Sequence, residues 1–443
     1  ESWKRHGPAR HQTLRATMDW SYELLSPAAQ QLLRRLSVFV DGFTLAAATS
    51  VGSDGDEASA LDLLGSLADA SLINVDETAG VSRYSFLETV RQYAAIRLVE
   101  TDETDETGLR FARFALAIAE AANLSGEAEG LQDHRAVVAE EANICAALDW
   151  ASAHDVPLAV RLAIALENFW VTHDPPQGAR WLALLLADSE ALLPADLRAR
   201  ALRAYGSSLQ VIGERKRALH AYEQSLQLFR ALADERSIAL LLHRVAMVAL
   251  EQDDADRAEA LLTESLELAR RAGSRRAETQ ALGSLGSVER ARGDTDRARQ
   301  LFEQSEAMAA DLGRTWWRGV MLTNLAELAF ESSDYAAAES HASSSLRLAG
   351  AMGDRRMSAH ALLYLARIAS ASRDDRRAGR LVGAIEIEEQ REAISQWPRS
   401  ALTGSSSFSL DRTEFNRGRT EGRQLSLAQA SDYALGSRAV PDD

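Results

Sequence analysis

The stretch Asp296–Arg314, DRARQLFEQSEAMAADLGR, recurs along the chain at a constant step, and this recurrence predicts the architecture. Related stretches are KRALHAYEQSLQLFRALAD (216–234), DRAEALLTESLELARRAGS (256–274), YAAAESHASSSLRLAGAMGD (335–354) and RRAGRLVGAIEIEEQ (376–390). One alanine of each copy falls in a column spaced by 40 residues without insertion or deletion: Ala218, Ala258, Ala298, Ala338 and Ala378. An internal period of this length predicts a stack of similar supersecondary units.

Further columns show that each unit is a pair of helices. A serine column (Ser225, Ser265, Ser305, Ser345) and a glycine column (Gly273, Gly313, Gly353) keep the same step. Small residues let two helices approach closely, and glycine accepts the left-handed conformation that ends a helix. We expect the larger residues Tyr222, Leu262 and Phe302 to wedge against the neighbouring pair. No proline lies between Pro194 and Pro398, so helices can run through this region without a break.

We therefore predict five stacked antiparallel pairs over residues 197–389, wound into a right-handed superhelix. The pattern resembles the tetratricopeptide repeat in its two small positions and one aromatic position. It departs from that family in its period of 40 residues and in lacking the proline that commonly ends a repeat. Residues 101–196 have helical periodicity outside this register and read as a bridging region of degenerate pairs. Residues 390–443 are expected to form a helical cap and a tail.

Residues 12–100 have a different pattern, which predicts a winged-helix domain after a linker at 1–11. Ser26-Pro27 is a strong helix start, because serine caps the helix and proline suits its first position. Two strand-like runs, LINVDE and SRYSFLE, flank a loop at 78–80, and the helix TVRQYAAIRLVE follows. Helices followed by a hairpin are typical of a winged helix.

The run HQTLRATMDWSYELLSPAAQQLLRRLSVFVDGF with RYSFLETVRQYA resembles the winged-helix segment of bacterial STAND-type ATPases. These include large LuxR-type and SARP-type transcription regulators and cyclase-linked relatives. The run EGRQLSLAQASDYAL resembles the usual ending of that family. The resemblance implies an all-α fold, a winged-helix domain followed by a tetratricopeptide-like α-solenoid. It also implies a nucleotide-binding module upstream of Glu1, which would hold ATP or ADP in the parent protein.

The family carries a Met-His-Asp-like motif after the wing strand, where its histidine senses the bound nucleotide. Phe86, Leu87 and Glu88 occupy the matching positions here. Because leucine cannot donate a hydrogen bond to phosphate, sensing through a histidine is not expected. Arg83 or Arg91 could contribute positive charge in its place.

Composition excludes several function classes. A net charge of -16 disfavours contact with the phosphate backbone, so direct nucleic-acid binding is not expected. Cys145 is the single cysteine, which excludes an internal disulfide and a multi-cysteine zinc site and fits a reducing cytoplasm. No P-loop motif, metal-spaced histidine pair or bilayer-length apolar run is present. We therefore expect a non-enzymatic chain with no cofactor of its own and no membrane contact.

The candidate site is the concave groove, which the first helix of each pair lines in tetratricopeptide-like solenoids. For any one residue, a solvated helix face remains the alternative interpretation. Arginine would favour an acidic peptide, a carboxylate or a phosphorylated ligand, and we place Arg290 near the centre. The groove offsets of the family select these positions: Arg203, Gln210, His243, Met247, Gln280, Arg290, Thr323, Glu327, His360 and Arg367.

The function predicted from these observations is a regulatory or sensor scaffold of a STAND-type signalling ATPase or transcription regulator. It would bind a protein partner or a small-molecule inducer through the repeats. In this interpretation the winged helix packs against the first helices after Glu100 and acts as an internal switch module. The alternative is a transcription regulator that binds DNA directly through its winged helix. The candidate recognition helix, LDLLGSLADASL, carries no basic residue, which argues against this alternative.

Overall fold

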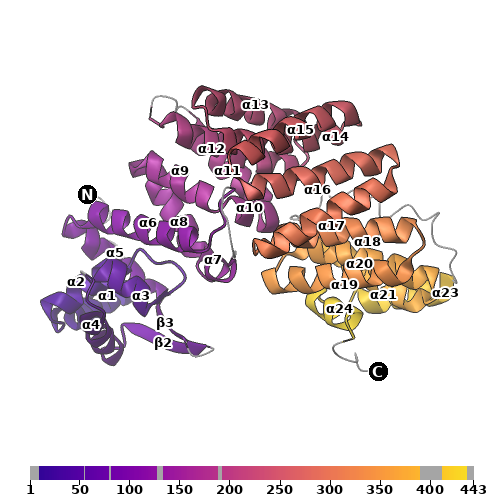
Figure 1. The fold of residues 1–443 in the computed structure, drawn as a ribbon. Helices are drawn as coiled ribbons and strands as arrows, with labels where there is room; N and C mark the ends of the chain where they lie inside the picture. The colour runs from indigo at the N-terminus through magenta and orange to yellow at the C-terminus, as the bar shows by residue number, and fades with distance from the viewer. Residues whose placement is uncertain are drawn as a thin grey trace. The chain divides into compact units, whose positions relative to one another are not determined.

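The computed structural model describes residues 9–53, 55–78, 81–126, 133–187, 192–389 and 412–436 (Figure 1). Residues 1–8 of the expected linker and residues 79–80 of the expected wing loop lie outside these ranges. The chain divides into two compact units: unit 1 comprises residues 1–121 and 136–162, and unit 2 comprises residues 122–135 and 163–443. The region 101–196 thus contributes helices to both units.

Unit 1 begins with a winged-helix domain. Ser26 caps α2 by accepting the amide of Ala29, with Pro27 in the first helical turn, as the sequence predicts. The elements are α1 Ala9–Glu23, α2 Pro27–Leu36, β1 Phe43–Thr44, α3 Leu45–Ala47, the π-helix η1 Ala48–Gly52, α4 Glu57–Asp69, β2 Ile73–Thr78, β3 Val81–Phe86 and α5 Glu88–Glu100.

The wing is an antiparallel three-stranded sheet with the order β1-β3-β2. The hairpin β2–β3 was expected from the sequence, whereas β1 was not, because two residues are too few to show an alternating pattern. Phe43 of β1 lies opposite Tyr84 of β3, and their rings stack with centroids 5.9 Å apart. Gly42 just before β1 has a φ of 72°, which only glycine adopts readily.

The winged helix packs against the helices that follow it in unit 1, which are α6 Thr104–Ala121, α7 Arg135–Ala139 and α8 Glu141–His154. The helix α9 Val156–Ala165 comes next in the chain. Phe39 is buried and meets Phe111 of α6 edge to face, with ring centroids 5.0 Å apart. Asn143 of α8 accepts a hydrogen bond from the amide of Val40 at 2.9 Å. The predicted packing of the winged helix on the helices after Glu100 is therefore confirmed.

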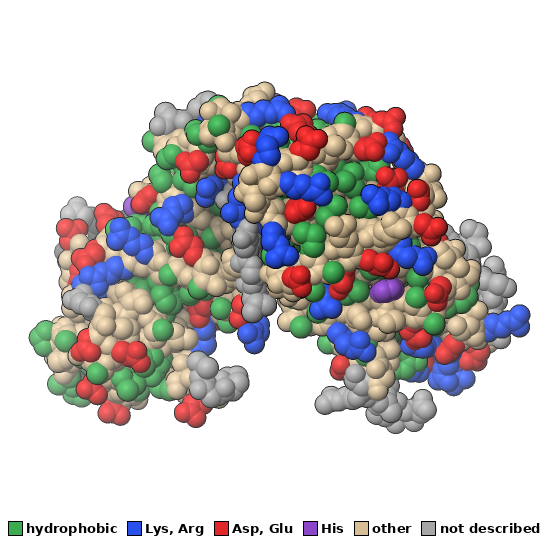
Figure 2. Space-filling view, viewed as in Figure 1, with side chains coloured by type: hydrophobic (Ala, Val, Ile, Leu, Met, Phe, Trp, Pro, Cys, Tyr) green, Lys and Arg blue, Asp and Glu red, His purple; other side chains and the backbone are tan. Residues whose placement is uncertain are grey.

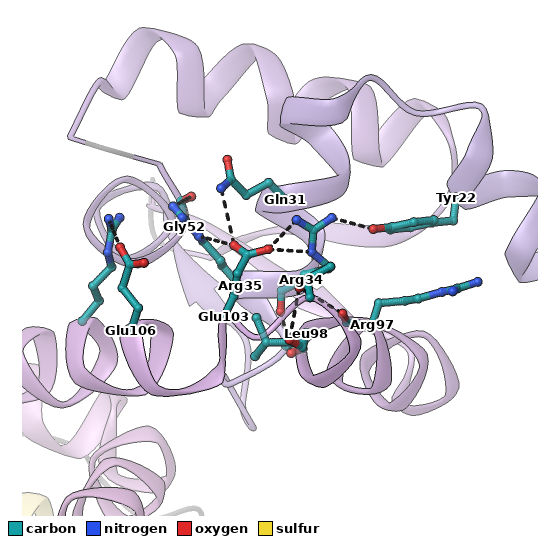
Figure 3. Close-up of polar contacts among 12 residues, drawn as sticks. Tyr22, Gln31, Arg34, Arg35, Gly52, Arg97, Leu98, Glu103 and Glu106 are labelled. Atoms are coloured by element: carbon teal, nitrogen blue, oxygen red, sulfur yellow. Dashed lines mark hydrogen bonds and ion pairs between the residues drawn. The ribbon is translucent and has the colours of Figure 1, made fainter. Parts of the chain in front are cut away.

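Glu103, between α5 and α6, fastens α2 to this junction (Figure 3). Arg34 Nη2 lies 2.5 Å from one carboxylate oxygen, and Arg35 Nε lies 3.0 Å from the other. Gln31 donates to the same carboxylate, and Arg34 also donates to the Tyr22 hydroxyl at 2.6 Å. Burial raises the pKa of Glu103, but the hydrogen bonds and charges of the two arginines outweigh this effect, so the pKa is lowered.

Unit 2 contains the repeats. The helices that start successive pairs begin 40 residues apart from α12 onward, as the alanine register predicts. The helices are α10 Glu167–His173, α11 Pro175–Leu186, α12 Ala195–Val211, α13 Arg215–Ala231, α14 Glu235–Leu250, α15 Ala255–Arg271, α16 Arg275–Arg292, α17 Thr295–Asp311, α18 Thr315–Glu331, α19 Tyr335–Met352, α20 Arg355–Ala371, α21 Asp375–Glu389, α23 Arg412–Gly422 and α24 Leu427–Ala434.

The constant 40-residue spacing of these columns reflects contacts that recur from pair to pair. The five register alanines are fully buried. A Cβ added to Gly206 would lie 2.5 Å from the Tyr222 ring, and one added to Gly286 would lie 2.8 Å from Phe302. Tyr222 and Phe302 therefore lie over the small residue of their own pair. Tyr222 also shares a core cluster with Ile238 and Leu242 of the next pair.

The serine column forms a hydrogen bond that recurs from pair to pair. Each serine is fully buried. Its hydroxyl donates to a carbonyl 26 residues earlier, on the first helix of the pair, and so satisfies both groups away from water. The bonds join Ser225 to Ala199, Ser265 to Ala239, Ser305 to Thr279 and Ser345 to Gly319, at 2.7, 2.7, 2.7 and 3.0 Å.

Glycines on both partners bring α21 and α23 into backbone contact. Gly379 and Gly383 on α21 would each place an added Cβ within 2.2 Å of a backbone carbonyl on α23. Gly418 and Gly422 on α23 would do the same against Arg376 and Arg380 of α21. Two carboxylates flank the contact, because Glu421 pairs with Arg376 and Arg380, and Glu386 pairs with Arg419 and Arg423.

Replacement of Ala298 by leucine should overpack the α16–α17 contact and lower the free energy of unfolding by about 1–3 kcal/mol. Thermal or denaturant unfolding measures the change. Ala307→Leu is the control, because Ala307 lies on the same helix with an exposed side chain. Equal stability of the two variants would contradict the packing described here.

Gly418→Ala and Gly350→Ala should change stability in opposite directions. The first forces a methyl group against a carbonyl and should cost about 1–3 kcal/mol. Gly350 lies within α19 with no atom near its would-be Cβ, so alanine there should stabilise by about 0.5–1 kcal/mol through helix propensity. Denaturant titration of both variants tests the pair, and a neutral Gly418→Ala would exclude the close helix contact.

Candidate functional site

The ten candidate residues lie on one face of the first helices of the pairs, α12, α14, α16, α18 and α20. Positions four or seven residues apart on a helix lie on the same face. Three of them are not exposed, either in an open groove or on a solvated helix face. Arg203, His243 and Gln280 are only 2%, 3% and 4% exposed, so this part of the face is enclosed by protein.

Arg203 forms a buried ion pair that the sequence did not indicate. Its Nη2 atom lies 3.0 Å from Oε2 of Glu167, the first residue of α10, and Glu167 is 1% exposed. Ser207, one turn after Arg203, donates its hydroxyl to the other carboxylate oxygen at 3.1 Å. The carboxylate thus has donors on both oxygens, which offsets part of the cost of burying it.

His243 lies beside Trp317, with ring centroids 5.4 Å apart and the rings edge to face. Burial, together with the charges of Arg244 and Arg276, lowers the pKa of His243 to about 3. The imidazole is therefore neutral at physiological pH and can offer one N–H and one lone pair. Burial and the charge of Arg356 lower the pKa of His360 to about 3 in the same way.

The remaining candidates lie toward the C-terminal ends of the same helices and are half-buried. Arg290 pairs with Glu327 at 2.5 Å, so the proposed centre of the groove is already neutralised by a second candidate residue. Arg367 lies over the rings of Phe330 and Tyr364, at 4.8 and 5.5 Å from their centroids. Burial, followed by the charge of Glu327, raises the pKa of Tyr364.

Three other candidates make local contacts. Gln210 donates to Glu251 and accepts from the Tyr222 hydroxyl, both at 3.0 Å. Thr323 donates to the carbonyl of Gly319 and lies 2.9 Å from the Ser345 hydroxyl, so it joins the serine hydrogen bond of that pair. Met247 is half-buried. These residues support the packing of neighbouring helices, and their contacts indicate no ligand.

In the winged helix, Glu88 and the two arginines considered for positive charge, Arg83 and Arg91, are engaged with neighbours in unit 1. Glu88 accepts two hydrogen bonds from Arg91, which with Gln92 lower the pKa of Glu88 to about 2. Arg83 pairs with Glu140 at 2.6 Å and also donates to the carbonyl of Asp41. Both arginines border a cavity of about 480 Å³ beside the wing.

The described residues contain no cluster of three or more His, Cys, Asp or Glu side chains that could hold a metal ion. Within the same ranges, every helix is too short or too polar to cross a bilayer. On the face drawn in Figure 2, basic and acidic side chains alternate over the repeats and do not gather into one basic tract.

Comparison with known proteins identifies both parts of the chain. Residues 25–99 match the winged helix-turn-helix domain family, and residues 237–311 match the tetratricopeptide repeat family. The chain therefore consists of a winged-helix domain followed by tetratricopeptide-type repeats, and both domain types are regulatory and not catalytic.

The chain matches only part of the length of its relatives. A protein of Mycobacterium tuberculosis provisionally named an HTH-type transcriptional regulator is 38% identical over 204 residues, which are 44% of this chain and 23% of the relative. An uncharacterized protein of Mycobacterium bovis is 39% identical over 103 residues, 23% of this chain and 26% of that protein. The chain thus covers about a quarter of the length of these relatives.

Among solved structures, a STAND protein with a tetratricopeptide repeat sensor from Pyrococcus horikoshii superposes with a TM-score of 0.56. The alignment covers 96% of this chain and 61% of that protein, at 16% sequence identity. At this identity the likeness shows the fold alone.

Glu167→Gln should destabilise unit 2 strongly, because it removes a buried carboxylate that pairs with Arg203. Breaking a buried ion pair in this way costs about 3–5 kcal/mol. The matched control is Glu235→Gln, which breaks the exposed pair with Arg271 and should cost about 0–1 kcal/mol. Chemical denaturation of both variants decides the matter, and similar costs would show that the Arg203–Glu167 pair is not buried.

Proposed function

We propose that this chain is the regulatory and sensor part of a STAND-type signalling ATPase, of the kind found in large LuxR-type and SARP-type transcription regulators and cyclase-linked relatives. The repeats bind a partner protein or a small inducer in the cytoplasm. The winged helix relays that event within the parent protein to an upstream nucleotide-binding module, which holds ATP or ADP. The order of a winged helix followed by repeats supports this role, as does the fold shared with the STAND protein of Pyrococcus horikoshii.

The observation that carries the proposal is that arginines of the winged helix form ion pairs with carboxylates of the same unit. Arg34 and Arg35 are bound to Glu103, Arg83 to Glu140, Arg91 to Glu88, and Arg97 to Asp19 and Glu100. A DNA-binding domain needs such side chains to reach phosphates. Here they fasten the domain to itself and to α8, which suits a module that works inside a protein.

The second candidate function is direct DNA binding through the winged helix. It is favoured by the match of residues 25–99 and by the name of the mycobacterial relative. The helix that precedes the wing, α4, opposes it. This helix begins with Glu57 and ends with Asp69, and it contains no lysine or arginine, so a DNA phosphate would meet repulsion there.

A DNA titration of the full chain separates the two functions. We expect fluorescence anisotropy of a labelled duplex to show no binding tighter than about 1 µM at physiological salt, the tight end of ordinary non-specific affinity. Sequence-specific binding at nanomolar concentration would overturn the proposal in favour of the second candidate. The reading frame of the parent gene gives an independent test, because the proposal requires a P-loop motif upstream of the winged helix.

A double substitution at the half-buried end of the groove tests the repeats as the binding surface. Arg290→Ala with Arg367→Ala should reduce the response of the parent protein to its inducer, measured as inducer-dependent ATP hydrolysis. The control is Arg257→Ala, an exposed arginine on a second helix of a pair. An unchanged response with an intact fold would place the binding surface elsewhere.

A further inference from the structure

One segment of the chain links the two units. Residues 122–135 lie between α6 and α7 in the chain and form part of unit 2, whereas α6 and residues 136–139 of α7 form part of unit 1. We call the described residues of this segment, 122–126 and 133–135, the strap. Because the strap is covalently continuous with both helices, a displacement of the strap is passed on to them through the chain.

The strap is held against α10 at both ends of this helix. At its start, the amide of Asn168 donates to the carbonyl of Leu124 at 2.8 Å, and the Leu124 side chain is fully buried. At its end, the ring of His134 stacks on the ring of His173, with centroids 5.3 Å apart. His173 stacks in turn on Phe169, with centroids 4.6 Å apart. The strap and α10 therefore pack as one layer.

The same histidines lie beside the start of α20, which comes much later in the chain. The helices α10 and α20 are in contact. A Cβ added to Gly353, just before α20, would lie 3.9 Å from Nε2 of His173. Asp354 caps α20 by accepting the amide of Met357. Its negative charge acts on both His134 and His173. An early and a late helix of the stack thus meet at the strap.

The first helices of the pairs lie close together on the inner face of the repeats. His243 of α14 lies beside Trp317 of α18, two pairs further on, with ring centroids 5.4 Å apart. Arg203, His243 and Gln280 on this face are at most 4% exposed. A ligand or partner therefore reaches the inner face only after first helices separate. Between α10 and α20 such a separation breaks no helix pair, because these two helices belong to different pairs.

His134 makes the junction costly to keep closed. Among the described residues, neither of its ring nitrogens has a hydrogen-bond partner, and its side chain is 5% exposed. Buried polar groups without partners are rare, because each has lost its bonds to water. Burial, followed by the charge of His173, lowers the pKa of His134 to about 4. The charges of Asp354 and Asp133 oppose this effect. Burial lowers the pKa of His173 as well, with Asp354 opposing and Arg355 adding to the effect.

We propose that the strap is a latch: it holds α10 against the start of α20, and its release carries a change in the repeats to α6 and α7. This proposal rests on the proposed function, because it names the element through which the repeats would act on the winged-helix unit. A ligand shifts a two-state element toward the state to which it binds better, and the inner face is accessible in the released state. The unpaired ring of His134 lowers the cost of release, because its nitrogens regain water.

Acidification releases the latch without a ligand, and it therefore tests the proposal on the full chain. A histidine exposed to water has a pKa of 6.5, against about 4 for His134 in the closed latch. The released form binds more protons between these two values, so falling pH favours release. Between about pH 7.5 and about pH 5, the ratio of closed to released latch should fall more than about tenfold.

Hydrogen exchange followed by mass spectrometry measures the release. After correction for the intrinsic exchange rate, the amides of the strap and of the first turn of α20 should lose more than about tenfold of their protection at the lower pH. Circular dichroism should report an unchanged helix content over the same range. Equal protection at the two pH values would overturn the proposal.

His134→Phe is the decisive variant, because phenylalanine keeps a ring that can stack on His173 but takes up no proton. At neutral pH its strap should be at least as protected as in the natural chain, since the unpaired nitrogens are gone. Its protection should change less than about twofold on acidification. His220→Phe, at an exposed position of α13, is the control and should respond like the natural chain.

Release of His134→Phe to the same extent as the natural chain would overturn the assignment of the latch to His134. An unfolding temperature of this variant at or above that of the natural chain excludes misfolding as the cause of a changed response. His134→Gln, which also takes up no proton, gives the same test where phenylalanine disturbs the packing.

The relay to unit 1 is tested on the same samples. In the natural chain, the amides of α7 and of the last turn of α6 should lose protection together with the strap, and in His134→Phe they should keep it. Release of the strap with unchanged protection of α6 and α7 would overturn the relay. The DNA titration and the parent reading frame test the regulatory role by themselves, so failure of the latch is distinguishable from failure of the proposed function.

Discussion

The close approach of the two helices within each pair is the constraint on which the repeats depend. It requires an alanine or glycine at the crossing point, because any larger side chain would push the helices apart. It also allows a buried serine of the second helix to reach a carbonyl of the first, at 2.7–3.0 Å in four successive pairs. Because both groups are removed from water, the bond holds each pair in one register. The constant 40-residue step is the consequence of repeating this geometry without change.

The two units place their ion pairs at different depths. In the winged helix, five arginines are neutralised by carboxylates, and the Glu103 network makes the junction between α5 and α6 part of the domain. In unit 2, Arg203 and Glu167 form a pair whose side chains are only 2% and 1% exposed. The first arrangement resists change and suits a relay that moves as one body. The second pair is removed from water, so the loss of either partner is expected to cost more stability there.

Much of the fold could be predicted from the sequence, because its contacts repeat. The alanine, serine and glycine columns each correspond to one recurring contact, and the Ser26-Pro27 start of α2 is a local signal. The short strand β1 could not be predicted, since pairing with β3 alone defines it. The contact between α21 and α23 was missed, although glycines four residues apart on both segments were a visible signal for it.

The candidate site was predicted less completely, for a physical reason. The groove offsets selected Arg203 and His243, but they could not show that these side chains are buried. Glu167 lies outside the repeat register, so its pairing with Arg203 depends on how α10 packs in unit 2.

The helix α23 covers the last helix of the solenoid, α21. In a linear array each repeat is stabilised by its neighbours, and a terminal repeat has one neighbour where internal repeats have two. Backbone contact with α23 gives α21 the second neighbour that its position in the array denies it. The stability of the last pair is thus comparable to that of an internal pair, and fraying does not begin there. A signal that loosens the array must therefore act from within, where the pairs meet.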